Sequence, residues 1–308
     1  HAQLQFALTV RMAATVRTPK TAQEALSGPN RHEWKLSMDR EIKSLRSFKA
    51  FEFAPLPRGR KAIKMKWVFR VKQNAKGEVL KLKSRLTCCG HAQRWGIDCL
   101  EVFAPVASYT TIRMVLAHAA LFDWELHQMD VDSAFLNSNL DVPICCIPPP
   151  HLAAPPGLHV LLKCALYGLK QGSRCFNLLI HEFLVTKCGL TQSDDDPCLC
   201  FLRNKAHDIV MCIFVDDLLI SAASVHSIMW LKTKLNNRFS MTDQGELKWM
   251  LGMHVQRNRP KRTLTLDQSQ HINDTLKKCA MSNANSSPSP ADCKVTLTKS
   301  MAPSSPDQ

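Results

Sequence analysis

The sequence lacks any hydrophobic run long enough to cross a bilayer. Its most apolar stretch, residues 209 to 223, is shorter than the roughly 20 residues that a membrane helix needs, and two adjacent aspartates, Asp216 and Asp217, interrupt it. The chain also shows no signal peptide at its start and no internal repeat. These absences predict a mostly globular protein with no membrane segment.

The sequence also lacks the cysteine spacing of a structural zinc site. Thirteen cysteines are present. A zinc site needs a second pair of cysteines or histidines at short spacing, and the sequence offers none for Cys88-Cys89, Cys145-Cys146 or Cys198-x-Cys200. The cysteines are dispersed through apolar runs of a 308-residue chain, unlike those of a small secreted disulfide scaffold. We therefore expect reduced, intracellular thiols and no structural zinc.

Acidic residues are scarce except in the middle of the chain, and the net charge is +14. Residues 31–94 carry 18 Lys or Arg against 5 Asp or Glu, residues 95–225 carry 7 against 14, and residues 226–285 carry 10 against 4. An excess of positive charge is typical of proteins that bind polyanions, although solubility or a membrane surface also explains it. Basic flanks around an acidic centre favour an enzyme that grips a phosphate backbone and concentrates metal cations at one point.

Residues 66 to 86 predict a β-hairpin with one cationic face. The segments KWVFRVK and EVLKLKSRL alternate apolar and basic residues on either side of QNAKG. The apolar face is predicted to hold Trp67, Phe69, Val71, Leu80, Leu82 and Leu86, and the opposite face Lys66, Arg70, Lys72, Lys81, Lys83 and Arg85. A solvated strand face is the usual explanation of alternating charge. Six cations without an intervening acid nevertheless favour contact with the phosphates of a nucleic acid or a nucleotide.

Apolar periodicity predicts the remaining elements. Helical spacing is found at residues 31–48, at 112–119 after a cap at Ser108, Thr110 or Thr111, and at 176–184, 228–239 and 271–279. Residues 123–131 predict a strand ending near Asp130, and residues 209–221 predict two strands joined by a tight turn. The tail from residue 286 is rich in Ser and Pro and is expected to be disordered.

The turn between the last two strands contains Asp216 and Asp217. Adjacent carboxylates at the mouth of an apolar core repel one another unless cations neutralise them. For this dipeptide alone, a turn exposed to water is the better explanation. Asp130 ends another predicted strand, however, so three carboxylates on neighbouring strands could bind two Mg²⁺ ions. Such ions, roughly 3.5–4 Å apart, activate a primer 3′-hydroxyl and stabilise the leaving pyrophosphate.

Three segments of the sequence resemble the palm motifs of copia-type LTR retrotransposon reverse transcriptases. They are HQMDVDSAFLN (127–137), ALYGLKQGSR (165–174) and FVDDLLI (214–220), and their order and spacing agree with the family. The segments KAIKMKWVFRVK, KLKSRL, GIDCLEVFAPVAS with TIR, and MTDQGELKWMLG resemble the flanking regions, so the similarity covers about residues 24–279. The resemblance identifies a fragment of a Pol polyprotein with RNA-directed DNA polymerase activity. It implies an α+β fold, a right-hand polymerase with fingers, a ferredoxin-like palm and a partial thumb.

The resemblance also implies an order of domains and a set of partners. Residues 1–30 are a leader or the end of a preceding linker, 31–122 the fingers, and 123–240 the palm with an inserted segment at about 140–190. Residues 241–285 form the primer grip and the start of the thumb, and 286–308 the tail. The implied partners are dNTP, an RNA or DNA template-primer and two Mg²⁺ ions, with Mn²⁺ as a substitute, in the cytoplasm or virus-like particles. No protease, integrase or RNase H sequence fits in this length.

Site residues follow from the resemblance by position. Asp130 and Asp216 bridge the metals, and Asp217 completes the carboxylate set. Phe135 lies beneath the incoming sugar and excludes a 2′-hydroxyl, with a core aromatic as the alternative. The nucleotide site comprises Lys83, Arg85, Phe135, Gln171 and Gly172, and the nucleic-acid backbone is contacted by Lys66, Arg70, Lys72, Arg257, Arg259, Lys261 and Arg262.

Several segments depart from the family pattern, among them Thr87-Cys88-Cys89, Cys164, residues 142–151 and Cys175-Phe176. All three aspartates are retained. Three hypotheses therefore stand for this chain. It is an active polymerase copying RNA and DNA, a module that binds nucleic acid without turnover, or an inert relic of a transposon.

Overall fold

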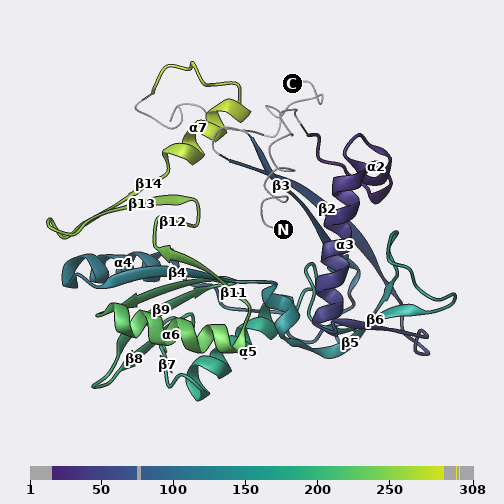
Figure 1. Ribbon diagram of the computed structural model, residues 1–308, viewed down its shortest axis with the longest axis horizontal. Coiled ribbons are helices and arrows are strands. Elements are labelled where there is room, and N and C mark those ends of the chain that lie inside the picture. Colours follow the sequence, from purple (N-terminus) through teal and green to yellow (C-terminus); the bar gives the residue numbers. More distant parts are fainter. Residues whose placement is uncertain (1–15, 75–77, 288–295, 297, 299–308) are drawn as a thin grey trace, which may run out of the picture. The chain divides into compact units, whose positions relative to one another are not determined.

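The computed structural model describes residues 16–74 and 78–287, together with residues 296 and 298 (Figure 1). It forms two units. The first contains the described residues up to Leu247 together with Arg257–Leu264, and the second contains Lys248–Gln256 and the described residues from Thr265. No helix within the described ranges is long and apolar enough to cross a membrane. The tail predicted to be disordered falls largely outside the described residues.

The first unit begins with a five-stranded sheet in the order β1-β6-β5-β2-β3. Its strands are β1 (Phe51–Ala54), β2 (Ile63–Gln73), β3 (Val79–Cys88), β5 (Asn139–Ile147) and β6 (His159–Cys164). β2 and β5 are parallel, and the other neighbours are antiparallel. The hairpin predicted at residues 66–86 is confirmed as β2 and β3, although part of its turn, residues 75–77, lies outside the described residues.

Helix α3 (Arg31–Ser47) lies along β3, the edge strand of this sheet (Figure 1). The Ser37 hydroxyl donates to the carbonyl of Leu82 at 3.0 Å and accepts from the backbone N–H of Ser84 at 2.8 Å. One turn further on, the Glu41 carboxylate accepts from the N–H of Leu86 at 3.1 Å. The helix thereby satisfies edge groups that would otherwise be left unpaired. The helix predicted at 31–48 is confirmed, whereas periodicity did not indicate α2 (Ala22–Ser27) before it.

One position of the hairpin was predicted wrongly. Leu80 was expected on the apolar face, but its side chain is 54% exposed, and Val79 is buried instead. The register between β2 and β3 shifts between Lys72 and Gln73. An irregularity of this kind exchanges the inward and outward positions of a strand, because side chains alternate with a period of two.

The second sheet of this unit has six antiparallel strands in the order β11-β4-β10-β9-β8-β7. They are β4 (Glu125–Val131), β7 (Thr191–Gln192), β8 (Leu199–Arg203), β9 (Asp208–Phe214), β10 (Asp217–Ala222) and β11 (Met241–Glu246). The strands predicted at 123–131 and 209–221 are confirmed.

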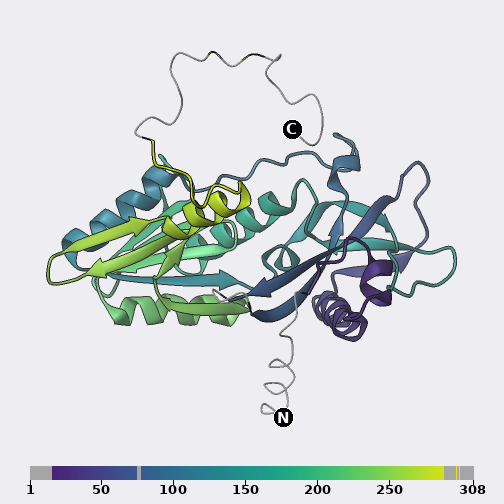
Figure 2. The ribbon, with the colours of Figure 1, turned by 90° about the horizontal axis from the view of Figure 1, so that it is seen from above.

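Three helices accompany this sheet, namely α4 (Tyr109–Phe122), α5 (Gly172–Thr186) and α6 (Val225–Arg238). In Figure 2, strands of this sheet run between α4 and α6. Ser108, one of three predicted caps, accepts from the Thr111 N–H at the start of α4. Along the chain, β4-α5-β9-β10-α6-β11 forms a βαββαβ unit whose strands lie in the order β11-β4-β10-β9. This is the ferredoxin-like arrangement expected for the palm.

The second unit holds β12 (Trp249–Met250), most of β13 (Met253–Asn258), part of β14 (Thr263–Asp267) and helix α7 (Ser269–Lys278). The three strands form a small sheet with β13 in the middle. The helix predicted at 271–279 is confirmed as α7.

Cysteines of the described chain are free thiols, and most are buried. Burial raises the pKa of Cys200 and Cys212 to about 12. These thiols therefore stay protonated near neutral pH and act as small apolar groups in the core.

Candidate active site

The three predicted aspartates meet at one end of the second sheet. β10 pairs with β4 so that Asp217 lies directly opposite Asp130. Asp216 occupies the turn between β9 and β10, and its carbonyl accepts from the N–H of Val131 at 3.0 Å. Strand pairing thus gathers carboxylates that are distant in the sequence.

The turn that carries Asp216 is strained. Val215 has a φ of 58°, in the left-handed region that a β-branched residue seldom adopts. Ser133, which follows the other acidic strand, has a φ of 53°. Strain of this kind persists only where the surrounding structure enforces it, and it is concentrated at functional sites. Here the pairing of β9 with β10 enforces it.

Burial and mutual repulsion disfavour the charged forms of two of the aspartates. Burial, followed by the charges of Asp216, Asp217 and Asp132, raises the pKa of Asp130 to about 6. Burial and the charge of Asp216 also raise the pKa of Asp217. A hydrogen bond of 3.0 Å from the Gln128 amide opposes this rise by favouring the charged carboxylate.

This group of aspartates fits a divalent cation that is shared with a substrate. Mg²⁺ prefers carboxylate oxygens and is often held by one or two of them, with water and substrate phosphates as its other ligands. Within residues 16–74 and 78–287, no three His, Cys, Asp or Glu side chains are placed to hold an ion by themselves. The aspartates therefore fit the open kind of site better than a closed protein cage. The carboxylates repel one another, and a bound cation would relieve that repulsion.

A polar cavity of about 240 Å³ adjoins these aspartates. The hairpin contributes Lys72, Lys83 and Arg85 to its wall, while the second sheet and its turn contribute Asp130 and Asp216. Burial lowers the pKa of Lys83, and the charges of Arg85, Lys72 and Lys81 lower it further. Asp132 and Glu41 also line the cavity, so three cations share it with four carboxylates. A pocket of this kind is suited to an anionic ligand that also binds a metal.

Lys83 and Arg85 both line this cavity, and their contact with a nucleotide stays a prediction. Lys72, which was predicted to contact the nucleic-acid backbone, lines the same cavity. Lys72 is paired with Lys81 across the hairpin, and Arg70 with Lys83. Like charges directly opposite one another destabilise a strand pair. A bound polyanion would remove this penalty. Lys66, paired with Thr87, is exposed on the same strand.

Phe135 lies near the same cavity and contacts Tyr167, which lines it. The two rings meet edge to face with centroids 4.9 Å apart, and the Arg85 guanidinium lies 4.6 Å from the Tyr167 centroid. A Cβ placed on Gly172 would lie 3.9 Å from the Phe135 ring, which is ordinary contact. Phe135 is half-buried in the short helix η2 (Ala134–Asn137), so its role in sugar selection stays a prediction.

Gln171 does not line the polar cavity. Its side chain is completely buried, and its amide is bonded to Gln93 and to the carbonyl of Asp98. The structure therefore gives Gln171 two protein partners, and the nucleotide contact that the resemblance implies stays a prediction.

Three of the four arginines and lysines predicted to contact nucleic acid near residue 260 bind the protein itself. Arg257 donates to the Ala119 carbonyl and to Asp123, both at 3.0 Å. Arg259 pairs with Glu125 and Asp123, and Arg262 donates to the Leu121 carbonyl at 2.9 Å. These contacts clamp the carboxyl end of α4, where positive charge also complements the helix dipole. Lys261 is exposed.

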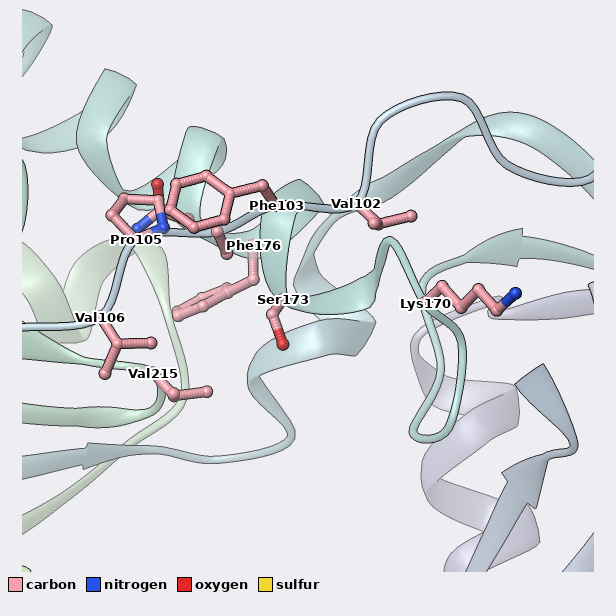
Figure 3. A pocket seen from close by; sticks show the side chains of 10 residues that line it. Val102, Phe103, Pro105, Val106, Lys170, Ser173, Phe176 and Val215 are labelled. Atoms are coloured by element: carbon pink, nitrogen blue, oxygen red, sulfur yellow. The ribbon is translucent and has the colours of Figure 1, made fainter. Parts of the chain in front are cut away.

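An apolar cavity of about 310 Å³ lies on the other side of the strained turn (Figure 3). Phe103, Pro105 and Val106 come from the loop before α4, Phe176 comes from α5, and Val215 comes from the turn. Phe103 is 79% exposed. The sequence analysis assigned no role to this loop beyond its resemblance to a flanking segment of the family.

Four residues near the site were not predicted individually. Tyr167 and Gln128 stand inside the quoted motifs, where their closeness to Gln171 and Asp130 was the available signal. Glu41, which also lines the polar cavity, and Gln93 come from other parts of the chain. No local pattern distinguishes them, because only tertiary contacts bring them to the site.

Comparisons with known proteins agree with these observations. The family described as "Reverse transcriptase (RNA-dependent DNA polymerase)" matches residues 48–292. The retrovirus-related Pol polyprotein from transposon TNT 1-94 of Nicotiana tabacum is 33% identical over 95% of this chain and 22% of its own length. The corresponding polyprotein from transposon RE1 of Arabidopsis thaliana is 32% identical over 91% of this chain and 19% of its own. The chain thus spans about a fifth of these relatives.

Among solved structures, a foamy viral protease-reverse transcriptase in complex with double-stranded DNA is similar to this chain with a TM-score of 0.45 and 12% identity. The match covers 82% of this chain and 37% of the viral one.

Proposed function

Because this chain belongs to the reverse transcriptase (RNA-dependent DNA polymerase) family, in the copia-type branch predicted from its motifs, we propose that it extends a primer on an RNA or DNA template with dNTPs. The observation that carries the proposal is the direct pairing of Asp130 with Asp217, beside Asp216 and a cavity lined by three cations. The transposon relatives suggest the cytoplasm or virus-like particles as the setting.

In this proposal Asp130 and Asp216, with Asp217, would hold two Mg²⁺ ions, or Mn²⁺ in their place. The ions would supply Lewis-acid activation of the primer hydroxyl and neutralise charge on the leaving pyrophosphate. Lys72, Lys83 and Arg85 bind the triphosphate and orient it toward the aspartates, because charge-assisted hydrogen bonds to phosphate are strong in a partly buried cavity. Phe135 and Tyr167 form the wall that would meet the sugar.

The exposed cations of the hairpin, Lys66 and Arg70, are proposed to contact the template-primer backbone. Of the four basic residues near residue 260, Lys261 keeps the proposed contact with the template-primer backbone. The proposed domain boundaries at residues 30, 122, 240 and 285 follow the family's order of fingers, palm and thumb. The boundary at 122 separates β1, β2 and β3 from β4, whereas β5 and β6 of the first sheet fall in the proposed inserted segment and β11 of the second sheet follows residue 240.

Primer extension on RNA and on DNA templates, with Mg²⁺ and dNTPs, tests the proposal. The unsubstituted chain should extend the primer, Asp216→Asn should abolish extension while primer-template binding is retained, and Asp208→Asn at the opposite end of β9 should behave as the unsubstituted chain. Normal extension by Asp216→Asn would show that the metal assignment is wrong. A folded chain that binds primer-template without extension would instead be the degenerate binding module.

A further inference from the structure

Gln171 forms half of a buried pair of carboxamides. The side-chain amide of Gln93 donates to the Gln171 side-chain oxygen at 2.8 Å. Both amides also donate to the backbone carbonyl of Asp98, at 3.0 and 3.1 Å. Gln93 is 4% exposed and Gln171 is 0% exposed. Water therefore cannot replace these partners freely, and the two side chains depend on each other for their hydrogen bonds.

The pair belongs to a junction between residues 88–98 and residues 167–171. At one end of the junction, the Cys88 N–H donates to the Tyr167 carbonyl at 2.8 Å. At the other end, the Gln93 side-chain oxygen accepts from the Lys170 N–H at 2.8 Å. The two segments are therefore tied together by side-chain and backbone bonds on both sides of a close crossing.

The crossing itself requires glycine. A Cβ on Gly90 would lie 2.0 Å from the Gly168 carbonyl oxygen, and a Cβ on Gly168 would lie 2.2 Å from the Cys88 carbonyl oxygen. Gly168 also has a φ of 90°, which favours glycine. The segments are packed backbone to backbone here, so a change in the glutamine pair is transmitted to the neighbouring residues of both.

Those neighbours include the aromatic wall of the polar cavity. Tyr167 begins the second segment, and its ring contacts Phe135. Gly172 follows Gln171, and its Cβ position lies 3.9 Å from the same Phe135 ring. Tyr167 therefore contacts Phe135, and Gly172, just after the segment, lies close to the same ring, while neither Gln93 nor Gln171 lines the cavity.

We propose that Gln93 and Gln171 act as one unit that positions Tyr167 and Phe135. Both are positioning residues, and Gln171 acts through its hydrogen bond with Gln93. The consequence of this positioning for sugar selection rests on the proposed polymerase function.

A first test reads the position of Tyr167 without requiring activity. The sequence has two tyrosines, so fluorotyrosine labelling gives two ¹⁹F NMR signals, with the exposed Tyr109 as an internal reference. Methionine matches glutamine in length but makes no comparable hydrogen bonds. Gln93→Met and Gln171→Met should each shift the Tyr167 signal in the same direction and leave the Tyr109 signal in place.

The matched control is Ser227→Ala, which removes a buried hydroxyl bonded to His207 near the start of α6. It should leave the Tyr167 signal unchanged. An unmoved Tyr167 signal in Gln93→Met, or an equal shift in the control, would overturn the proposal. If either glutamine variant fails to fold, Gln93→Asn and Gln171→Asn, which keep the carboxamide on a side chain one methylene shorter, should each shift the Tyr167 signal and leave the Tyr109 signal in place.

A second test compares nucleotide selection in the two single variants and in the double variant. Each single variant should lower the preference for dNTP over rNTP by about tenfold, and the double variant should be no worse than either. If Gln171 contacts the nucleotide directly, Gln171→Met will lose selectivity while Gln93→Met will not. Failure of the unsubstituted chain to extend primers would contradict the proposed function, whereas the NMR test would still decide the positioning of Tyr167.

Discussion

Gln128 and Asp217, 89 positions apart in the sequence, are joined by a hydrogen bond of 3.0 Å. β4 therefore supplies both Asp130 and Gln128, and the Gln128 amide holds the carboxylate of Asp217, which lies opposite Asp130. The neutral amide stabilises the charged form of Asp217 without adding a further charge to a cluster already crowded with carboxylates. The hydrogen bond thereby opposes the rise in the pKa of Asp217 that burial and the charge of Asp216 cause.

We expect Gln128→Met to raise the Mg²⁺ concentration needed for half-maximal primer extension by about tenfold. The substitution removes the contact that lowers the pKa of Asp217, so a proton competes better with the metal. A Mg²⁺ titration at fixed pH measures this shift. Gln192→Met, at an exposed strand, is the control. An unchanged Mg²⁺ requirement in Gln128→Met would mean that Asp217 does not contribute to the metal site.

Asp130 should make the protein less stable as pH rises. Its pKa is raised from 3.8 to about 6 in the folded state, so the folded chain holds the proton more tightly than the unfolded chain. The free energy of unfolding should therefore fall between about pH 4 and pH 6 and level off above. Denaturant unfolding across this range, without Mg²⁺, measures the slope.

The same reasoning predicts that Asp130→Asn flattens this part of the profile. After a discount for solvent screening, we expect a gain on the order of 1 kcal/mol at pH 7 relative to the unsubstituted chain. Asp208→Asn should keep the original slope. If the free energy of unfolding of Asp130→Asn fell as steeply with pH as that of the unsubstituted chain, the titrating group would be a residue other than Asp130.

Phe135→Val should lower the preference for dNTP over rNTP by about tenfold or more, because a smaller side chain leaves room for a 2′-hydroxyl. Single-nucleotide incorporation with matched dNTP and rNTP measures this ratio. Phe183→Leu, which removes a ring that contacts Phe239 in the core, controls for the loss of an aromatic. Unchanged selectivity in Phe135→Val would leave Phe135 as a core aromatic, the alternative that the sequence had kept open.

Glu41→Gln should lower the KM for dNTP by about threefold to tenfold, because it removes a negative charge from the cavity that is proposed to hold the triphosphate. Glutamine keeps an oxygen acceptor for the Leu86 N–H. Ser37→Ala, which breaks two bonds to the same edge strand without changing a charge, should reduce stability but leave KM unchanged. A higher KM in both variants would instead mean that dNTP binding depends on the geometry of β3 and not on the charge of Glu41.

Arg257→Gln should reduce the free energy of unfolding by about 1–3 kcal/mol, because Arg257 is 9% exposed and bonded to the end of α4. The dependence of nucleic-acid binding on salt should not change. Lys261→Gln should have little effect on stability and should reduce the salt slope by about one unit if Lys261 contacts a phosphate. A reduced slope for Arg257→Gln would restore the role predicted from the sequence.

Local pattern was sufficient to predict the elements that carry the site. Alternation identified β2 and β3, and helical spacing identified α3 and α6, because these patterns reflect which face of each element is buried. Leu80 was misassigned because a shift of register leaves no mark in the alternation itself. The protein contacts of the arginines near residue 260 were not predicted, because a cation that binds phosphate and a cation that binds a carboxylate look alike in sequence.

The sequence by itself determined the family, the order of the motifs and the positions of the three aspartates within those motifs, since each is encoded by residue types at fixed spacings along the chain. Only the tertiary structure decided that Asp130 faces Asp217, that Glu41 and Lys72 share a cavity with Asp216, and that Gln171 is bonded to Gln93. The physical reason is that these relationships depend on strand register, burial and the approach of distant segments, which arise only when the sheets close around their cores.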